Sequence, residues 1–327
     1  MRNLVNKLPE QIKHAVEIAD NAKLDNATQP ILNVCISGLG GSGIGGTIVS
    51  QLTGDKASIP IIINKDYSLP SFVNKDTLFI ASSYSGNTEE TLIALEKAQK
   101  SGAQIACITS GGKLLEIAKA NNYNHIVIPG GYPPRSAFGY SSVQLFRLLT
   151  HYNLIDQEFR TDISRVYSHL IEYKEEIMVD AEGIADKLLN KIPIIYSDAG
   201  FEGIGVRFRQ QINENSKMLC WHHVLPEMNH NELVAWAKNY PETAVVIFRN
   251  EDDFYRTQKR MEFAESQISK STSSYTEIWS KGNSIVERAY YLIYLGDWVS
   301  VILAEKQGID PVEVDVIGIL KDQLADL

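Results

Sequence analysis

The chain has 327 residues, of which 44% are hydrophobic and 22% are charged, and its formal net charge is −9 at pH 7. This composition is typical of a globular protein with room for two domains of about 150 residues each. The acidic balance and the lack of a Lys/Arg block argue against a nucleic-acid surface, and no run of residues approaches the ~18 apolar residues of a membrane span.

The amino-terminal residues Met1–Lys7 lack the apolar segment of a signal peptide, so no targeting segment is expected. Three cysteines, Cys35, Cys107 and Cys220, form no CxxC pair, and the first two lie inside apolar runs. These features favour buried, reduced thiols in a cytoplasmic protein.

After an amphipathic helix from Leu8 to about Ala22, short apolar strands alternate with helical segments. We expect the strands at residues 33–37, 60–64, 77–82, 104–109 and 125–128, and the helices between them near 43–54, 88–101 and 112–121. Strands separated by helices of this length predict βαβ units and a parallel sheet. A Gly/Pro-rich loop then leads into a helix that runs to about His151.

A polar, helical stretch from about residue 152 to 190 separates this half from a second one. The second half repeats the scheme, with a strand at 193–197, a glycine turn, a helix at about 205–216 and a strand at 244–248. Its turn Phe201–Gly205 matches Gly41–Gly45. We interpret the repeat as an internal duplication in which the second copy kept its strands and lost its Ser/Thr loops.

A glycine-rich loop, Gly38–Gly46, follows the first strand and opens a helix. Gly38, Gly40 and Gly43 satisfy the G-x-G-x-x-G spacing of a dinucleotide site, and Asp66 stands near the end of the next strand, where a ribose-binding acid is sought. A nicotinamide oxidoreductase is therefore one alternative, although a lone match of this kind is weak evidence.

A second loop, Ser82–Glu90, ends the third strand and starts a helix. We expect the hydroxyls of Ser83, Ser85 and Thr88 beside the helix start, where backbone N–H groups and the helix dipole favour an anion. No lysine accompanies them, which argues against a Walker-type nucleotide loop. The alternative is an ordinary helix cap at Thr88. Together the two loops predict a pocket for a small phosphorylated ligand.

The two loops and three further segments form a set of motifs that is spread over nearly the whole chain. In chain order the set is Gly38-Leu-Gly-Gly-Ser-Gly43, Ser83-Tyr-Ser-Gly-Asn-Thr-Glu-Glu-Thr91, Pro133-Pro-Arg-Ser-Ala-Phe-Gly-Tyr140, Asn213-Glu-Asn-Ser-Lys217 and His230-Asn-Glu232. With the amino-terminal Leu8-Pro-Glu-Gln11, they resemble the bifunctional phosphoglucose/phosphomannose isomerases of the sugar isomerase (SIS) superfamily.

The resemblance implies an α/β fold with two SIS domains, which we place at residues 1–152 and 153–327. Each is expected to be a parallel five-stranded sheet flanked by helices, in a flavodoxin-like three-layer αβα arrangement. The resemblance also implies a homodimer that interconverts hexose 6-phosphates, an aldose–ketose reaction of glycolysis and gluconeogenesis, without a metal or a nicotinamide cofactor.

The same resemblance assigns roles to individual residues. Phosphate is expected on Ser83, Ser85 and Thr88, and the sugar along Ser42 and the backbone of Gly40, Gly41 and Gly43. Glu214 is identified as the base that moves a proton between C1 and C2, and Arg135 as the cation beside the enediolate oxygen. Ring opening falls to Lys321 and to His230, which similar enzymes supply from the neighbouring subunit.

Each of these residues also has an ordinary interpretation. Glu214 could be a solvated helix carboxylate, Arg135 a surface residue of a Pro/Gly loop, and Lys321 a surface lysine. A metal site is a further alternative for the segment around His230, because His222, His223, Glu227 and Glu232 are close to it in sequence, although no zinc-type spacing occurs.

Val314 marks one departure from the family pattern. It lies seven residues before Lys321, where conventional phosphoglucose isomerases carry glutamine and the bifunctional enzymes carry a smaller residue, often threonine. Val314 keeps a small side chain but lacks the hydroxyl group of threonine. A small side chain leaves room for rotation at C2 and favours use of mannose 6-phosphate. Two other functions stay open, a non-catalytic sugar-phosphate sensor and an isomerase or deaminase of an amino sugar phosphate.

Overall fold

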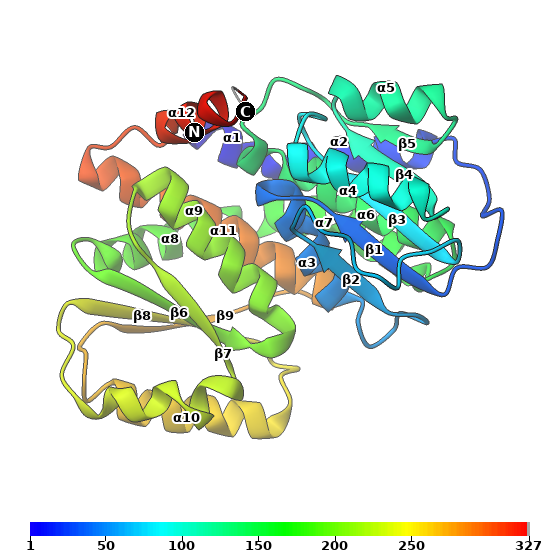
Figure 1. Cartoon of the computed structure of the whole chain (residues 1–327). Coiled ribbons are helices and arrows are strands. Elements are labelled where there is room, and N and C mark those ends of the chain that lie inside the picture. Colours follow the sequence, from blue (N-terminus) through cyan, green and yellow to red (C-terminus); the bar gives the residue numbers. More distant parts are fainter. Residues whose placement is uncertain (326–327) are drawn as a thin grey trace. The chain divides into compact units, whose positions relative to one another are not determined.

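The computed structural model describes residues 1–325, and the chain forms two compact units (Figure 1). The N-terminal unit comprises Asn6–Glu172 and Gly282–Tyr290, and the C-terminal unit comprises Met1–Val5, Tyr173–Lys281 and the chain from Tyr291 onward. The boundary between the two SIS domains after residue 152 remains a sequence-based proposal. The boundary between the two compact units lies later in the chain, after helix α7 (Glu158–Glu172).

The N-terminal unit contains a parallel sheet with the strand order β2-β1-β3-β4-β5. Its strands are β1 (Asn33–Ser37), β2 (Ile61–Asn64), β3 (Thr77–Ser82), β4 (Gln104–Thr109) and β5 (Asn124–Val127). Its helices, besides α7, are α2 (Leu8–Asn21), α3 (Gly40–Leu52), α4 (Glu89–Lys100), α5 (Gly112–Ala120), the 3-10 helix η1 (Pro134–Ser136) and α6 (Phe138–His151). The predicted βαβ pattern is confirmed, with β1, β3 and β4 at the expected residues.

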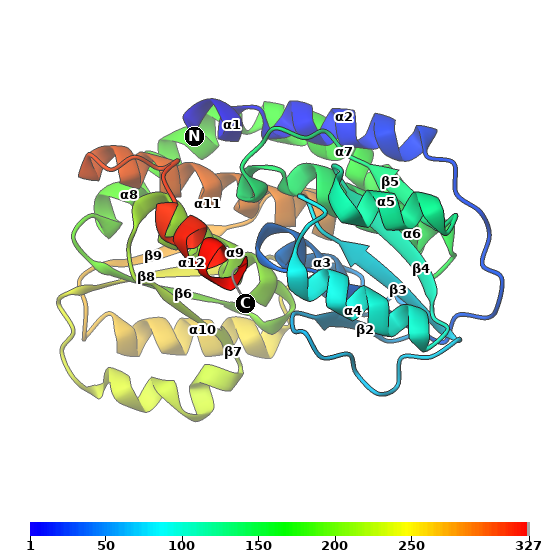
Figure 2. The same ribbon diagram turned by 45° about the horizontal axis from the view of Figure 1, so that its top comes forward.

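Helices cover both faces of this sheet because its strands are apolar on both sides. One face packs on α4 and α5 through a buried cluster that includes Cys35, Phe79, Leu95, Cys107 and Leu114. On the other face, Gly46 of α3 lies against Ile36 and Ile63, and α2 and α7 pack on α6. Figure 2 shows α4 and α5 as one layer over the sheet. The three-layer arrangement is confirmed for this unit.

The C-terminal unit contains a second parallel sheet, with the strand order β7-β6-β8-β9. Its strands are β6 (Ile192–Asp198), β7 (Trp221–Leu225), β8 (Thr243–Arg249) and β9 (Tyr275–Trp279). Its helices are α1 (Arg2–Asn6), α8 (Lys174–Leu188), η2 (Ala199–Phe201), α9 (Glu202–Ser216), η3 (Glu227–His230), η4 (Glu232–Ala237), α10 (Tyr255–Ile268), α11 (Ile285–Gln307) and α12 (Asp315–Ala325). Residue 6 at the end of α1 and residues 285–290 at the start of α11 belong to the N-terminal unit.

The second sheet corrects one detail of the prediction. Over the described residues it has four strands in place of the expected five, because the chain passes from β9 into α11 with no further strand between them. Its order nevertheless repeats β2-β1-β3-β4 of the first sheet, which is the relation that an internal duplication predicts. Along residues 1–325, no helix combines the length and the apolar character needed to cross a membrane.

Candidate active site

The two predicted loops leave the sheet of the N-terminal unit at the same point. Strands β1 and β3 are parallel neighbours, and the strand order reverses between them. In open α/β sheets, ligands bind outside the carboxyl ends of the strands at such a switch point. The glycine loop after β1 and the serine loop after β3 therefore lie where this fold class places its ligand.

The glycine loop needs its glycines mainly because it lies very close to other backbone. A Cβ atom at Gly38 would be 2.6 Å from the carbonyl oxygen of Ser82, and one at Gly43 would be 2.3 Å from the carbonyl oxygen of Gly38. Gly40 differs, since its φ of +51° suits glycine while open space lies in front of it. This position leaves room for a ligand to approach the backbone.

The serine loop forms a hydrogen-bonded turn at the start of α4. The hydroxyls of Ser83 and Thr88 are 2.8 Å apart, and the backbone N–H groups of Gly86 and Asn87 donate to the hydroxyls of Ser83 and Ser85 at 3.1 and 3.2 Å. Thr88 occupies the N-cap position of α4, but its side chain makes no capping hydrogen bond. Thr88 therefore stands at the helix start without capping it through its side chain, and the use of this turn as an anion site stays a prediction.

Tyr84, which the sequence analysis did not single out, links this loop to its neighbours. Its backbone N–H donates to the hydroxyl of Ser42 in the glycine loop at 3.2 Å. Its own hydroxyl donates to the carbonyl oxygen of Pro129 at 3.1 Å and accepts the backbone N–H of Tyr132 at 2.9 Å. Ser110 binds its carbonyl oxygen at 2.7 Å. The side chain is 9% exposed, so Tyr84 is a buried junction of three loops.

Arg135 lies in η1, next to the glycine loop. A Cβ atom at Gly41 would be 2.8 Å from the carbonyl oxygen of Pro134 and 3.5 Å from the Cα atom of Arg135. The side chain of Gln11 donates to the carbonyl oxygen of Ser136 at 2.8 Å and holds the turn from the other side. Arg135 is only 5% exposed, so the interpretation as a surface residue is wrong.

Lys65 is a second residue near the loops that the sequence analysis missed. It directly follows β2, is exposed, and its Cε atom would be 3.7 Å from a Cβ atom at Gly43. Asp66, the acid considered for a ribose, lies in the same exposed turn and accepts the backbone N–H of Ser68 at 3.4 Å. The signal that could have found Lys65 is its place at the carboxyl end of a strand beside the switch point.

Glu214 lies in the last turn of α9, in the C-terminal unit, and is half-buried. The other polar side chains of its segment bind the surrounding structure. Asn213 donates to the carbonyl oxygen of Met218 at 2.7 Å, and Asn215 and Ser216 donate to Ser300 of α11 at 2.9 and 2.7 Å. The hydrogen bonds of Asn213, Asn215 and Ser216 thus fix the backbone on both sides of Glu214.

A row of buried polar side chains, which we call the polar seam, joins α9 to α11. It lies one and two helical turns before Asn215. Arg207 and Gln211 both bind Asp297, with distances of 2.6 and 2.8 Å, and the three side chains are at most 4% exposed. With Asn215 they occupy positions i, i+4 and i+8 of α9, which share one face of a helix. This seam sets the rotation of α9 and therefore the side on which Glu214 lies.

His230 ends η3 and is exposed. Glu232, which follows it closely, is tied to the sheet because it accepts hydrogen bonds from the hydroxyl of Tyr196 in β6 and pairs with Nδ1 of His223 in β7 at 2.9 Å. Trp236 donates to the same Tyr196 hydroxyl at 3.0 Å. The short segment that carries His230 is therefore anchored to two strands through its glutamate.

The histidines considered for a metal site point to separate partners. His223 pairs with Glu232, while Nε2 of His222 lies 3.6 Å from Glu202 of α9. Burial, and then the nearby Arg209, lower the pKa of His222. Among residues 1–325, no group of three or more His, Cys, Asp or Glu side chains is placed to hold a metal ion.

Lys321 is exposed on α12, and Val314 is half-buried just before this helix begins. The structure thus brings one part of the predicted site together within the N-terminal unit, namely both loops and Arg135. Glu214, His230 and Lys321 lie on three separate segments of the C-terminal unit.

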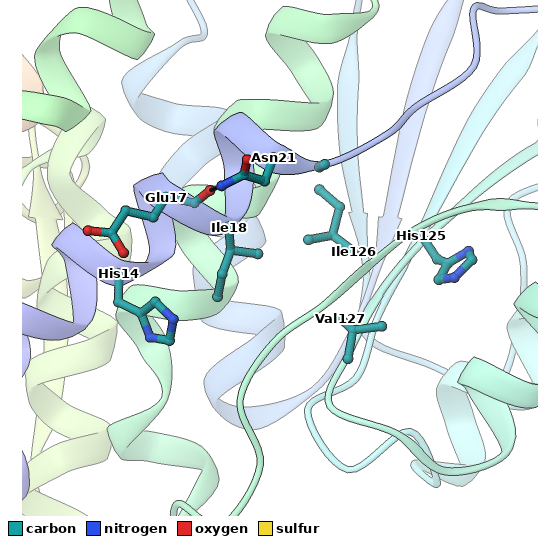
Figure 3. Close-up of a pocket in the computed structure, with 8 residues that line it drawn as sticks. His14, Glu17, Ile18, Asn21, His125, Ile126 and Val127 are labelled. Atoms are coloured by element: carbon teal, nitrogen blue, oxygen red, sulfur yellow. Dashed lines mark hydrogen bonds between the residues drawn. The ribbon is translucent and has the colours of Figure 1, made fainter.

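A hollow of about 390 Å³ lies elsewhere, between α2 and β5 (Figure 3). It is lined by His14, Glu17, Ile18, Asn21, Ala22, His125, Ile126 and Val127, and none of the predicted site residues is among them. The charged end of Glu17 and the ring of His125 point away from each other in Figure 3. Polar groups that do not converge make this hollow a poor candidate for the active site.

The chain is 42% identical to the bifunctional phosphoglucose/phosphomannose isomerase of Caldicellulosiruptor bescii, over 99% of this chain and 98% of that protein. The chain belongs to the bifunctional phosphoglucose/phosphomannose isomerase family. The family described as "Bacterial phospho-glucose isomerase C-terminal SIS domain" matches residues 178–324. The resemblance inferred from the sequence motifs is therefore confirmed, and the relatives that establish it are named as isomerases.

Two further comparisons widen this picture. The chain is 30% identical to the D-glucosamine-6-phosphate 4-epimerase of Sulfolobus acidocaldarius, over 89% of this chain and 88% of that protein. A solved structure, the C-terminal domain of glucosamine-fructose-6-phosphate aminotransferase from Francisella tularensis, matches with a TM-score of 0.73 and 14% identity, over 94% of this chain and 96% of that one. At this identity the match supports the α/β fold alone.

Proposed function

We propose that this protein interconverts glucose 6-phosphate, and also mannose 6-phosphate, with fructose 6-phosphate through a cis-enediolate. The observation that carries the proposal is the 42% identity to a named bifunctional isomerase over 99% of the chain. Every residue that the family motifs assign to chemistry, namely Arg135, Glu214, His230 and Lys321, is present in this sequence.

The N-terminal unit would hold the phosphate end of the substrate. Ser83, Ser85 and Thr88 offer hydroxyls beside the uncapped first turn of α4, where backbone N–H groups and the helix dipole stabilise an anion. The sugar would then extend along Ser42 and the glycine loop, where open space in front of Gly40 lets a ligand approach the backbone.

The reaction moves a carbonyl group between C1 and C2. Starting from the aldose, His230 and Lys321 open the ring, and Glu214 removes the C2 proton. The electron pair of that C–H bond forms the C1–C2 double bond, while the C1 carbonyl oxygen becomes an oxyanion that Arg135 stabilises. Glu214 then returns the proton to C1, and the C2 hydroxyl proton passes to the C1 oxygen, which leaves a hydroxyl group at C1 and a ketone at C2. No atom is gained or lost, so the step needs no redox partner.

The role of Glu214 has a direct test. Glu214→Gln keeps the size of the side chain and removes the base, so kcat should fall by at least ~100-fold while KM for fructose 6-phosphate changes little. Coupled measurement of glucose 6-phosphate formation gives both constants. Turnover near that of the unmodified protein would reject Glu214 as the base.

We further propose a cytoplasmic homodimer in which each active site takes His230 from the partner copy. Mixing inactive Glu214→Gln and His230→Ala proteins and letting the subunits exchange tests this arrangement. Half of a random mixture is heterodimer, and each heterodimer regains one intact site, so about a quarter of the full activity should return. If His230 acts within its own chain, the mixture stays inactive.

A reaction on an amino sugar phosphate is the second candidate, because a relative named as a D-glucosamine-6-phosphate 4-epimerase is 30% identical to this chain. Parallel assays on glucose 6-phosphate, mannose 6-phosphate and D-glucosamine 6-phosphate separate the candidates. The proposed function requires fructose 6-phosphate from the first two. Turnover of the amino sugar alone would replace it.

A further inference from the structure

Lys217 stands directly after the helix that carries Glu214, in an unusual backbone conformation. It is the C-cap residue of α9, with φ 53° and ψ 34°. The left-handed region costs a residue with a Cβ atom about 1 kcal/mol or more, and glycine is the usual choice at this place. A long, charged side chain at such a position therefore indicates that something else depends on it.

The ammonium group of Lys217 binds two backbone carbonyl groups in the C-terminal unit. Its Nζ atom donates to the carbonyl oxygen of Glu214 at 2.6 Å and to the carbonyl oxygen of Glu313 at 2.5 Å. The carboxylate of Glu313 is 3.9 Å away, and the lysine side chain is 29% exposed. The left-handed backbone turns the side chain back over the end of its own helix, where carbonyl groups lack helical partners.

The two carbonyl groups belong to the segments that carry proposed chemistry. One is the backbone of Glu214 itself. The other immediately precedes Val314 and α12, which carries Lys321. The segment before α12 is a short turn, held locally by the bond from the Val312 N–H to Asp310 at 2.8 Å and by the bond from the Asp315 N–H to Glu313 at 2.6 Å. One ammonium group thus joins the end of α9 to this turn.

We propose that Lys217 is a positioning residue for the isomerase reaction. It holds the Glu214 end of α9 and the turn that leads to Lys321 at a fixed separation, so that the base and the ring-opening lysine are placed together. The proposal rests on the proposed function through the roles of Glu214 and Lys321. A simple helix cap would explain the bond to Glu214 but gives no reason for the second bond, to Glu313.

Three variants test this role. Lys217→Met keeps an unbranched side chain and removes every donor, whereas Lys217→Arg restores a cation that can donate to two carbonyl groups. Lys306→Met is the matched control, because the Lys306 side chain is 23% exposed, against 29% for Lys217, and pairs with Glu182 and Asp186 of α8. For each protein, kcat and KM for fructose 6-phosphate are measured, together with amide hydrogen exchange over residues 310–321.

Lys217→Met should exchange faster over residues 310–321 and lose about tenfold or more in kcat, with KM within about threefold, since misplacing a catalytic group by ~1 Å costs up to ~100-fold. Lys217→Arg should recover most of kcat, and Lys306→Met should match the unmodified protein. Unchanged exchange in Lys217→Met, an unchanged kcat, or no recovery with arginine would each overturn the proposal. If Lys217→Met does not fold, Lys217→Gly replaces it, since glycine suits the left-handed backbone.

Failure of the proposed function gives a different result. In that case the unmodified protein shows no isomerase activity on hexose 6-phosphates, while the exchange measurement still reports whether Lys217 joins the two segments. Faster exchange in an inactive protein would keep the contact and reject its catalytic meaning.

Discussion

Removal of one hydroxyl group, by Tyr84→Phe, tests whether the three loops of the N-terminal unit act together. The hydroxyl accepts the Tyr132 N–H at 2.9 Å and donates to the Pro129 carbonyl oxygen at 3.1 Å, and the backbone of Tyr84 is held separately by Ser42 and Ser110. The substitution should therefore loosen the loop that leads to Arg135 and leave the serine loop in place.

Two hydrogen bonds are lost, and each contributes about 1 kcal/mol to stability, so the free energy of unfolding should fall by about 2 kcal/mol. For a unit of this size the melting temperature should drop by roughly 4–8 °C. Full loss of an oxyanion donor costs ~100-fold or more in kcat, and a loosened Arg135 should cost part of that, about tenfold. KM should stay within about twofold, because the phosphate contacts remain.

The assay is glucose 6-phosphate formation from fructose 6-phosphate, measured between pH 6 and pH 9. Burial raises the pKa of Tyr84 above its ordinary value, so the hydroxyl stays protonated over this range and the loss should not vary with pH. Tyr123→Phe is the control. It deletes a hydroxyl group that accepts a hydrogen bond from the side chain of Gln99 at 3.2 Å, away from the three loops. A kcat within twofold of the parent, or a loss confined to KM, would refute the reasoning.

Other substitutions and reagents probe the rest of the site and the core. Ser85→Ala and Thr88→Ala should raise KM for fructose 6-phosphate by about tenfold with little change in kcat, as expected for lost phosphate contacts, and an unchanged KM in both would remove the phosphate from that loop. Gly43→Ala should lower the melting temperature more than Gly40→Ala, because a Cβ atom at Gly43 would lie 2.3 Å from a carbonyl oxygen whereas Gly40 faces open space; the reverse order would contradict the described loop. Burial raises the pKa of Cys35, Cys107 and Cys220 to about 12, so the folded protein should resist iodoacetamide at pH 8, and rapid labelling of any of them before unfolding would contradict this environment.

The central strands were predictable because parallel strands buried on both faces appear in sequence as continuous apolar runs. Strands β1, β3 and β4 are of this kind and were predicted at their observed residues. Strands β7 and β9 were missed because each lies at an edge of its sheet and carries polar side chains, such as His222, His223 and Glu277. An edge position alone does not hide a strand, since β2 and β5 also lie at edges and were predicted within one residue of their observed bounds. The polar side chains of β7 and β9 remove the apolar signal.

The contacts of the candidate site were predictable where its residues are close together in sequence and hidden where they meet through folding. The serine loop could be read from its hydroxyls and the helix that follows. The role of Tyr84 could not, because its hydroxyl partners, Pro129 and Tyr132, are more than 40 residues away. Proximity in sequence also misled in one place, since His222 and His223 are adjacent on an extended strand and pair with different glutamates, Glu202 and Glu232.

The glycine loop explains why a dinucleotide fingerprint occurs in a family named for sugar phosphate isomerases. Gly38, Gly41 and Gly43 face carbonyl oxygens of Ser82, Pro134 and Gly38 at distances that no Cβ atom tolerates, so their identity follows from how closely three loops pack. A dinucleotide site demands the same small residues for its own close approaches. Tight packing at the strand–helix turn therefore accounts for the first and last glycines of the G-x-G-x-x-G spacing, Gly38 and Gly43, whereas the middle one, Gly40, has a positive φ and faces open space. The choice between ligands depends on the second loop, whose hydroxyls and uncapped helix start suit a single phosphate group.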